Sequence, residues 1–264
     1  MRATARIPPS SALVEPAYRL LLGAALPRVA ARRDRASRAL FRALSTTALD
    51  RIPHEEREWI SRIEARRAEL ASRDFSPFAR WASIAPVWGR FLMRTVRELS
   101  PRSCLELGTG FGISAAYQAA ALELNGAGSL TTLERIEGLG AIAEEGFSRL
   151  GLDGRVQLRL GSTDDSLAGV FEGAGPIDYA FLDADHTMEA TMAHFAALLP
   201  HLREGAIVVI DDINWTEGMR RAWKAIVGNE RVSRKLELRR VGIVVIGSRC
   251  GQGPPVRAQP TGER

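Results

Sequence analysis

CLELGTGFG, at residues 104–112, decides the fold of this 264-residue chain. The apolar run CLEL predicts a buried strand, the glycines predict a tight loop, and ISAAYQAAALEL, starting at residue 113, predicts a helix. Glycines at such a corner let the backbone approach a ligand closely. In an open α/β sheet this corner lies at the carboxyl ends of the strands, where ligands bind. The stretch therefore predicts both a fold class and the position of a site.

Apolar runs and helical stretches continue to alternate after this corner. Strands are expected at 129–134, 156–161, 177–185 and 205–212, and helices at about 138–150, 188–200 and 216–228. The last two runs, KLELRR and VGIVVIG, lie too close together for a helix between them, so we expect them to pair antiparallel. The pattern predicts an α/β fold with a Rossmann-like, doubly wound sheet of seven strands, mostly parallel with an antiparallel last strand.

The sequence before residue 101 predicts only helices. Two short amphipathic helices, separated by a break near Pro27, are expected in the first 50 residues. Further helices are expected at 55–72 and 84–99. We therefore divide the chain into a basic helical segment (1–53), a main domain that begins with a helical cap (54–248) and a disordered tail (249–264).

Charge is distributed unevenly along the chain. Residues 1–102 hold 20 Arg against 10 acidic residues, whereas residues 103–264 hold 16 basic against 21 acidic residues. A basic segment can favour an anionic membrane surface or nucleic acid. We prefer a solvated helical face, expect no nucleic acid, and leave open a weak membrane-surface contact and a homo-oligomer. The two Cys lack metal-ligand spacing and no apolar run is long enough to span a membrane, which favours a cytoplasmic protein.

Two acidic residues flank the glycine loop. Glu134 ends the second predicted strand and can accept hydrogen bonds from ribose hydroxyls. Glu106 would repel a pyrophosphate and attract a sulfonium ligand that carries an amino group. A dinucleotide loop needs glycine at position 113, which is Ile113 here. The arrangement resembles motif I of class I S-adenosylmethionine-dependent methyltransferases. This resemblance implies a cofactor site at Glu106, Gly108, Gly110, Gly112 and Glu134.

A second acidic cluster follows the fourth and fifth predicted strands. Asp183 comes after YAFL, and Asp211 and Asp212 come after IVVI. If these strands are neighbours, their carboxylates converge at one rim and repel one another. A hard divalent cation would relieve this repulsion, and oxygen ligands favour Mg²⁺, Mn²⁺ or Ca²⁺.

LDADH (182–186) followed by VVIDDINW (208–215) resembles the metal-dependent small-molecule O-methyltransferases, over roughly residues 84–247. These include catechol, caffeoyl-coenzyme A and macrolide-sugar enzymes. The resemblance implies that Asp183, Asp211 and Asp212 hold the metal, most simply Mg²⁺. It implies that His186 is the general base and that Asp183 contributes to catalysis and to the cofactor site. The Asp-Asp pair matches the sugar enzymes, since the catechol and caffeoyl enzymes have Asp-Asn.

Less specific matches complete the predicted site. Ser114 matches a position that contacts the cofactor carboxylate, although it can equally cap a helix. Ser162 and Thr163 match positions near the adenine, with helix capping as the alternative. The helix that carries Trp88 and Arg90 is expected to cover the cofactor. Trp215 either lines the substrate pocket or is a buried structural residue.

Taken together, these residues predict an S-adenosylmethionine-dependent O-methyltransferase that acts on a hydroxyl of a small molecule with a divalent metal. His186 would take the hydroxyl proton, since an imidazole can do so at neutral pH; a helix-start His that only contacts the acids is the alternative. Two other functions stay open. One is a metal-independent methyltransferase, and the other is a non-catalytic adenosyl-binding protein.

Overall fold

The computed structural model describes residues 11–30, 34–73, 83–161, 169–171 and 175–248. Its core is a seven-stranded sheet in the order β3-β2-β1-β4-β5-β7-β6. The first five strands run parallel, and β7 is antiparallel to both β5 and β6. This confirms the predicted sheet and its antiparallel last strand. The strands are β1 (Ser103–Leu107), β2 (Ser129–Glu134), β3 (Val156–Leu160), β4 (Ile177–Leu182), β5 (Leu202–Ile210), β6 (Val232–Leu238) and β7 (Val241–Ile246).

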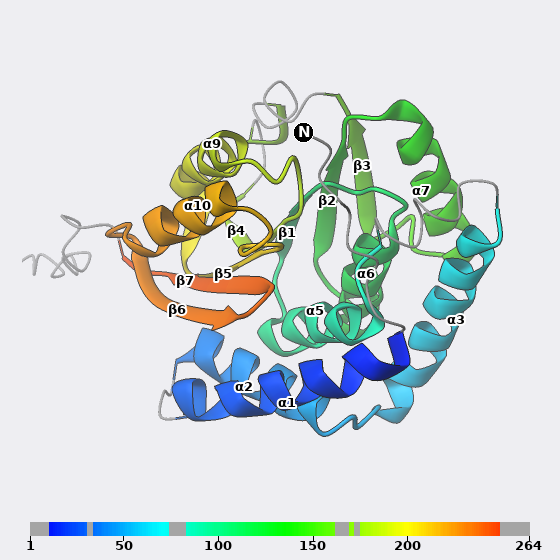
Figure 1. Ribbon diagram of the computed structural model, residues 1–264. Helices are drawn as coiled ribbons and strands as arrows, with labels where there is room; N and C mark the ends of the chain where they lie inside the picture. The colour runs from blue at the N-terminus through cyan, green and yellow to red at the C-terminus, as the bar shows by residue number, and fades with distance from the viewer. Residues whose placement is uncertain (1–10, 31–33, 74–82, 162–168, 172–174, 249–264) are drawn as a thin grey trace, which may run out of the picture.

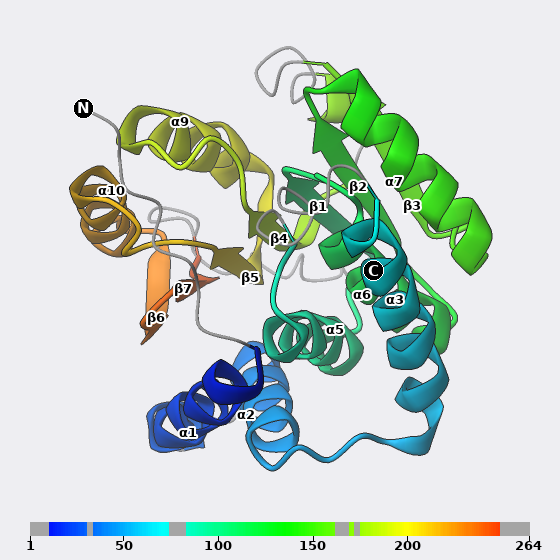
Figure 2. The same cartoon turned by 45° about the vertical axis from the view of Figure 1, so that its right-hand side comes forward.

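Helices cover both faces of the sheet (Figures 1 and 2). Along β4, Tyr179 and Phe181 join the core beneath one set of helices, whereas Ala180 and Leu182 join the core beneath the other. This alternation follows from the two-residue period of a strand whose two faces are both buried. One face carries α3 (His54–Ala71), α5 (Pro86–Leu99), α6 (Ile113–Asn125) and α7 (Glu137–Leu150), and the other carries α9 (Met188–Leu198) and α10 (Glu217–Val227).

The N-terminal helices form an additional layer on α5 (Figure 1). The two helices predicted in the first 50 residues are present, but helix α1 (Ser11–Ala30) continues through Pro27, so the predicted position of the break is wrong. Pro27 lies in the last turn of α1, where a proline removes one hydrogen bond near the helix end. Helix α2 (Arg35–Ala48) shares the core of α5. The division at residue 53 stays a prediction, and the predicted tail at 249–264 lies outside the described residues.

Ionic contacts join α1 and α3 to α5. Arg94 pairs with Glu56 at 3.0 Å, and both side chains are buried. Arg90 pairs with Glu15 of α1. Part of the basic excess is therefore used for packing between helices. Among the described residues, no helix combines the length and the apolar character that a membrane span requires.

Candidate functional site

A pocket of about 280 Å³ opens at the carboxyl ends of β1, β2 and β4. This is where the strand order reverses, because the chain goes from β1 outward to β2 and β3 before β4 pairs with β1 on its other side. Such a reversal is where open α/β sheets bind ligands. The described residues that line it are Ile84, Gly108, Thr109, Gly110, Ser114, Leu133, Glu134, Arg135, Ile136, Leu139, Asp183, Ala184, Asp185, His186, Asp212 and Arg240.

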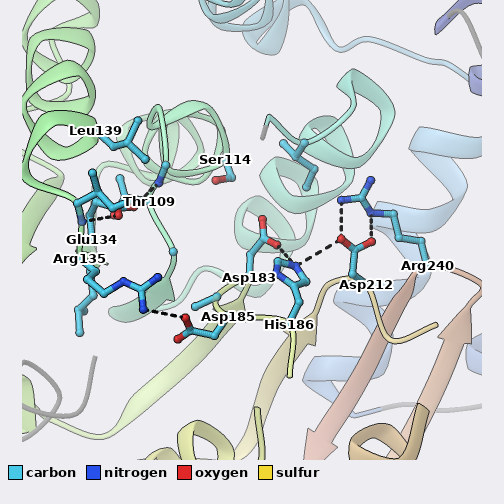
Figure 3. A pocket seen from close by; sticks show the side chains of 16 residues that line it. Thr109, Ser114, Glu134, Arg135, Leu139, Asp183, Asp185, His186, Asp212 and Arg240 are labelled. Atoms are coloured by element: carbon cyan, nitrogen blue, oxygen red, sulfur yellow. Dashed lines mark hydrogen bonds and ion pairs between the residues drawn. The ribbon is translucent and has the colours of Figure 1, made fainter. Parts of the chain in front are cut away.

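The residues of this pocket form two groups, and Figure 3 shows Ser114 and Glu134 of the first group apart from Asp183, His186, Asp212 and Arg240 of the second. We call the first group, Gly108, Gly110, Ser114 and Glu134, the glycine wall. We call the second group the acidic wall; it comprises Asp183, His186, Asp212 and Arg240, with Asp211 buried behind them. Arg135 and Asp185 form an ion pair of 3.2 Å at the rim (Figure 3).

Gly108 makes the turn out of β1 possible. Its φ of 93° is a conformation that only glycine adopts easily. A Cβ at this position would lie 2.2 Å from the carbonyl oxygen of Asp183, which no rotation of a side chain could relieve. The loop is therefore packed directly on the first residue after β4. This contact brings the two walls together.

Glu134 holds the glycine loop in place. One of its carboxylate oxygens accepts a hydrogen bond from the Gly110 N–H at 2.8 Å, and the other accepts one from the Ile136 N–H at 2.8 Å. Its side chain lines the pocket although the residue is only 8% exposed. Each carboxylate oxygen has two lone pairs, so Glu134 can still accept hydrogen bonds from a ligand.

Glu106 lies beneath the loop rather than among the residues that line the pocket. It is fully buried and accepts hydrogen bonds from Thr132 Oγ1 at 2.6 Å and Gln118 Nε2 at 2.8 Å. Burial raises the pKa of Glu106 to about 7, although hydrogen bonds from Thr132, Ser114 and Gln118 act in the opposite direction. Glu106 can therefore act on a ligand in the pocket only through its charge and not by direct contact.

The acidic wall is set by the register of three strands. Leu182 of β4 is paired with Leu107 of β1 and with Ile210 of β5. Asp183 and Asp211 directly follow these paired residues, and their backbone N–H groups extend the ladder to Leu107 and Leu182 at 2.9 Å. The acids expected after the fourth and fifth strands therefore do lie at one rim.

His186 lies between two of these acids. Its Nε2 is 3.1 Å from Asp183 Oδ1 and 3.4 Å from Asp212 Oδ2. The hydrogen bond to Asp183 raises the pKa of His186, and burial only partly opposes this. Burial and the charge of Asp211 raise the pKa of Asp183 to about 6 and that of Asp212 to about 7. The cluster therefore takes up protons more readily than isolated side chains would.

The backbone beneath the acidic wall is strained. Asp185, His186 and Asp212 have φ values of 58°, 46° and 52°, all in the left-handed region. A non-glycine residue there costs on the order of 1–3 kcal/mol and persists where the surrounding structure imposes it. Such strain is concentrated at functional sites, and here it turns these side chains toward the pocket.

The sequence prediction missed Arg240. Its guanidinium forms two hydrogen bonds with the buried Asp211, from Nε at 2.8 Å and from Nη2 at 2.7 Å. Its Nε also lies 2.9 Å from Asp212 Oδ1. Burial disfavours the charge, but Asp211 and Asp212 outweigh it and raise the pKa of Arg240. The sequence pointed only to pairing between the last two strands, and it is the observed pairing of β7 with β5 that places the Arg-Arg turn beside the acidic pair.

Several other predicted residues lie elsewhere. Trp215 is 67% exposed and is not among the lining residues, so it is neither a pocket wall nor a buried structural residue. Trp88 and Arg90 do not cover the pocket but pack on α1, against Tyr18 and Glu15. Gly112 is the N-cap of α6, has a φ of 79° and is not among the lining residues. Ser162 and Thr163 lie outside the described residues.

The predicted metal ligands lie close together, but two of them, Asp211 and Asp212, are already paired with Arg240. Within the ranges that the structure describes, no group of three or more His, Cys, Asp or Glu side chains could hold a metal ion. Arg240 engages both oxygens of Asp211 and also contacts Asp212. A guanidinium thus stands where the sequence predicted a divalent cation.

Comparison with known proteins gives matches over the same region. Residues 105–213 match a family model described as a methyltransferase domain. Over 132 residues the chain is 37% identical to catechol O-methyltransferase of Niastella koreensis, which corresponds to 50% of this chain and 58% of that protein. The chain thus matches less than two thirds of the length of this relative.

Solved structures match over a longer stretch. The O-methyltransferase from Bacillus cereus, in complex with SAH, is 25% identical with a TM-score of 0.57, and the match covers 71% of this chain and 90% of that one. TomG from Streptomyces achromogenes, an O-methyltransferase of tomaymycin synthesis in complex with SAM, is 22% identical with a TM-score of 0.57. The match covers 72% of this chain and 90% of that one. SAH-bound PaMTH1 from Podospora anserina is 19% identical with a TM-score of 0.60, and the match covers 75% of this chain and 89% of that one. The last two support the fold alone.

Proposed function

We propose that this chain, which contains a methyltransferase domain of the class I fold, transfers the methyl group of S-adenosylmethionine to a hydroxyl oxygen of a small molecule. One observation carries the proposal. A single pocket is lined on one side by the glycine loop with Glu134 and on the other by the Asp183–His186 pair. Such a pocket can hold a cofactor next to a group that takes up a proton.

The glycine wall fits the cofactor. Gly108 and Gly110 present backbone without side chains to the pocket, and Glu134 offers lone pairs to ribose hydroxyls. Ser114 lines the same wall and would contact the amino-acid end of the cofactor. Glu106 would act through its charge from behind the wall, and Gly112 by shaping the start of α6. The adenine contacts proposed for Ser162 and Thr163 stay predictions.

The acidic wall fits the proton chemistry of the acceptor. Bound S-adenosylmethionine supplies an electrophilic methyl group, and its sulfur keeps the electron pair of the S–C bond that breaks. Two carboxylates next to His186 Nε2 favour the tautomer with the hydrogen on Nε2. His186 Nδ1 is then the nitrogen that takes the hydroxyl proton as the new O–C bond forms. Asp183 stabilises the resulting imidazolium.

The divalent metal stays a prediction, and the donor set disagrees with it. Asp211 already holds the guanidinium of Arg240 through both oxygens, and Asp212 contacts Arg240 and His186. A metal at these acids would have to displace a cation that proteins cannot deprotonate. We therefore assign no step to a metal. Addition of EDTA to the assay tests the prediction directly.

The acceptor class follows from the chemistry of the site and from the relatives. Small hydroxyl compounds such as catechols, phenols and sugars are the candidates, since the relative from Niastella koreensis is a catechol O-methyltransferase. A non-catalytic adenosyl-binding protein is the alternative that the same glycine wall would permit. A cytoplasmic location, a weak membrane-surface contact and a homo-oligomer stay predictions.

The test uses the full chain with S-adenosylmethionine that is isotopically labelled in the methyl group. Calorimetric titration first measures cofactor binding. Labelled cofactor is then incubated with a panel of catechols, monophenols and hydroxylated sugars, and the products are identified by mass spectrometry. We expect binding of the cofactor and transfer of label to an oxygen of at least one class.

The outcomes separate the alternatives. Cofactor binding without transfer to any panel member would support the non-catalytic binder. Label found on nitrogen or carbon would contradict O-methylation, and absence of cofactor binding would contradict the whole proposal. Exposed Glu137, next to the pocket in sequence, offers a control, since Glu137→Gln should bind the cofactor like the unaltered chain.

A further inference from the structure

Arg240 is held beside the acidic wall by the backbone of the sheet. Gly242 of β7 pairs with Ile210, the last residue of β5. The carbonyl oxygen of Arg240 accepts a hydrogen bond from the Ile213 N–H at 2.9 Å. Pairing on both sides of Asp211 and Asp212 therefore fixes Arg240 next to them. The backbone position of Arg240 is therefore a consequence of the strand pairing, and its side chain is held by the acids themselves.

Asp211 is committed to this arginine. Only 1% of Asp211 is exposed, and both of its oxygens accept hydrogen bonds from Arg240. Two parallel hydrogen bonds between a guanidinium and a carboxylate are the strongest arrangement that this pair of groups can form. Asp211 Oδ1 also accepts the Asp212 N–H at 2.8 Å. Asp211, which is the most deeply buried of the three acids, thus already accepts three hydrogen bonds from within the protein.

Arg240 is linked to the other residues of the acidic wall by a chain of contacts. Asp212 contacts Arg240 through Oδ1 and His186 through Oδ2, and His186 in turn contacts Asp183 (Figure 3). Basic and acidic side chains therefore alternate from the turn before β7 to the end of β4. Arg240 both balances the acids and positions His186 through Asp212.

A divalent ion would face an unfavourable environment here. At the distances of this cluster, an ion bound by Asp211 or Asp212 would lie within a few ångströms of the guanidinium, and like charges at such separations repel strongly where water is scarce. Arg240 cannot lose its proton to make room. It could only move away from the acids, and that movement would break its hydrogen bonds to both oxygens of Asp211 and its ion pair with Asp212.

We infer that Arg240 takes the place of a divalent metal in this pocket, so that the site binds neither Mg²⁺ nor Mn²⁺ and methyl transfer depends on neither. The inference rests on the proposed function for its catalytic part and on the contacts above for its binding part. Arg240 is a positioning residue, since it acts on the reaction through Asp212 and His186.

The first test uses the unaltered chain. Mg²⁺ and Mn²⁺ are titrated by calorimetry up to millimolar concentrations, with and without S-adenosylmethionine. We expect no binding, and turnover that is the same with EDTA as with added Mg²⁺. Metal binding together with turnover that EDTA abolishes and Mg²⁺ restores would overturn the inference.

The second test removes the cation. Arg240→Met keeps an unbranched side chain of comparable reach but leaves the acids unpaired. We expect Mn²⁺ to bind this variant with a Kd at least about tenfold below the millimolar concentrations at which the unaltered chain shows no binding, and turnover to fall about tenfold and recover in part with Mn²⁺. Arg240→Lys, which keeps the charge but not the paired hydrogen bonds, should restore part of the turnover without metal. A merely structural role would produce neither metal binding nor rescue.

Controls keep the two proposals separate. The exposed neighbour Arg239, changed to Met, should leave metal binding and turnover unchanged. Thermal melting of each variant shows whether it folds; if Arg240→Met does not, the unaltered chain and Arg240→Lys still decide the matter. Metal titration needs no acceptor. A failed acceptor screen therefore counts against the proposed function, whereas Mn²⁺ binding to the unaltered chain counts against the inference.

Discussion

The two walls of the pocket are built in different ways. The glycine wall comes from one continuous stretch of β1, loop and α6, with Glu134 from the neighbouring strand. The acidic wall needs the ends of β4 and β5 and the turn before β7. The first is an arrangement of backbone hydrogen bonds, and the second is a balance of charges. The comparison teaches that local sequence suffices to specify a binding loop, whereas the charge state of a site depends on distant pairing.

The largest effect should come from the acidic wall. His186→Gln keeps a polar side chain but cannot take a proton at neutral pH, so we expect kcat to fall roughly 1,000-fold, within the range for loss of a general base. Cofactor affinity should be unchanged, because the glycine wall is intact. Stopped assays at saturating acceptor and calorimetric titration of the cofactor measure the two quantities.

His54 provides the control, because it is exposed at the start of α3 and His54→Gln should keep full activity. If His186→Gln retained more than a tenth of the kcat, the proton acceptor would have to be sought elsewhere in the wall. Asp183→Asn would then be the next variant to examine.

The difference between the walls also determines what the sequence could predict. The number of strands and the antiparallel last strand follow from hydrophobic runs and their spacing, whereas the convergence of Asp183 with Asp211 also needed β4 and β5 to be neighbours, as they are in the structure. Arg240 was missed because its partners lie 28 and 29 positions away and only the β5–β7 register brings them together. Trp215 was misplaced because an apolar side chain next to a site can still face solvent.

A second prediction breaks the contact between the walls. Gly108→Ala places a Cβ against the Asp183 carbonyl in a conformation that alanine avoids, so we expect the free energy of unfolding to fall by roughly 3 kcal/mol and cofactor binding to be lost. Urea unfolding measures the stability. Gly126→Ala is a matched control, since Gly126 also has a positive φ, of 67°, but a Cβ there would have nothing within 4 Å.

Only the cost of the left-handed conformation, about 1–2 kcal/mol, should be seen at Gly126. Equal losses in the two variants would mean that the close approach of Gly108 to Asp183 adds nothing. The two walls would then be held together by the sheet alone.

A third prediction concerns the buried carboxyl behind the glycine wall. Because the pKa of Glu106 is raised to about 7 in the folded state, that state holds a proton that the unfolded chain releases near pH 4.5. The stability that Glu106 contributes therefore falls as the pH rises between these values. Glu106→Gln removes this dependence, so its advantage over the unaltered chain should grow from pH 4.5 to 7 and then level off at no more than about 3 kcal/mol.

Glutamine fits this position because the hydroxyls of Thr132 and Thr109, 2.6 Å apart, can reverse the direction of their hydrogen bond. Asp183 and Asp212 titrate in the same range and are present in both proteins, so the difference reports Glu106 together with its interaction with the charge of Asp183. Urea unfolding of both proteins at several pH values gives the curve. A difference that does not vary with pH would show that Glu106 is ionised in the folded protein throughout.

The smallest effect should come from Glu134, which holds the glycine loop by hydrogen bonds. In Glu134→Gln the single carbonyl oxygen can accept a hydrogen bond from only one of the two backbone N–H groups, that of Gly110 or that of Ile136. The amide N–H₂ group then faces the other N–H, which loses its acceptor. The substitution also weakens the acceptor offered to a ribose. We expect the Kd for S-adenosylmethionine to rise roughly 30-fold, or about 2 kcal/mol, as for loss of a hydrogen bond to a charged group. Calorimetric titration measures it, with Glu137→Gln as the control.

Unchanged affinity for S-adenosylmethionine, with a lower melting temperature, would mean that Glu134 only stabilises the loop. The cofactor would then be recognised by backbone alone.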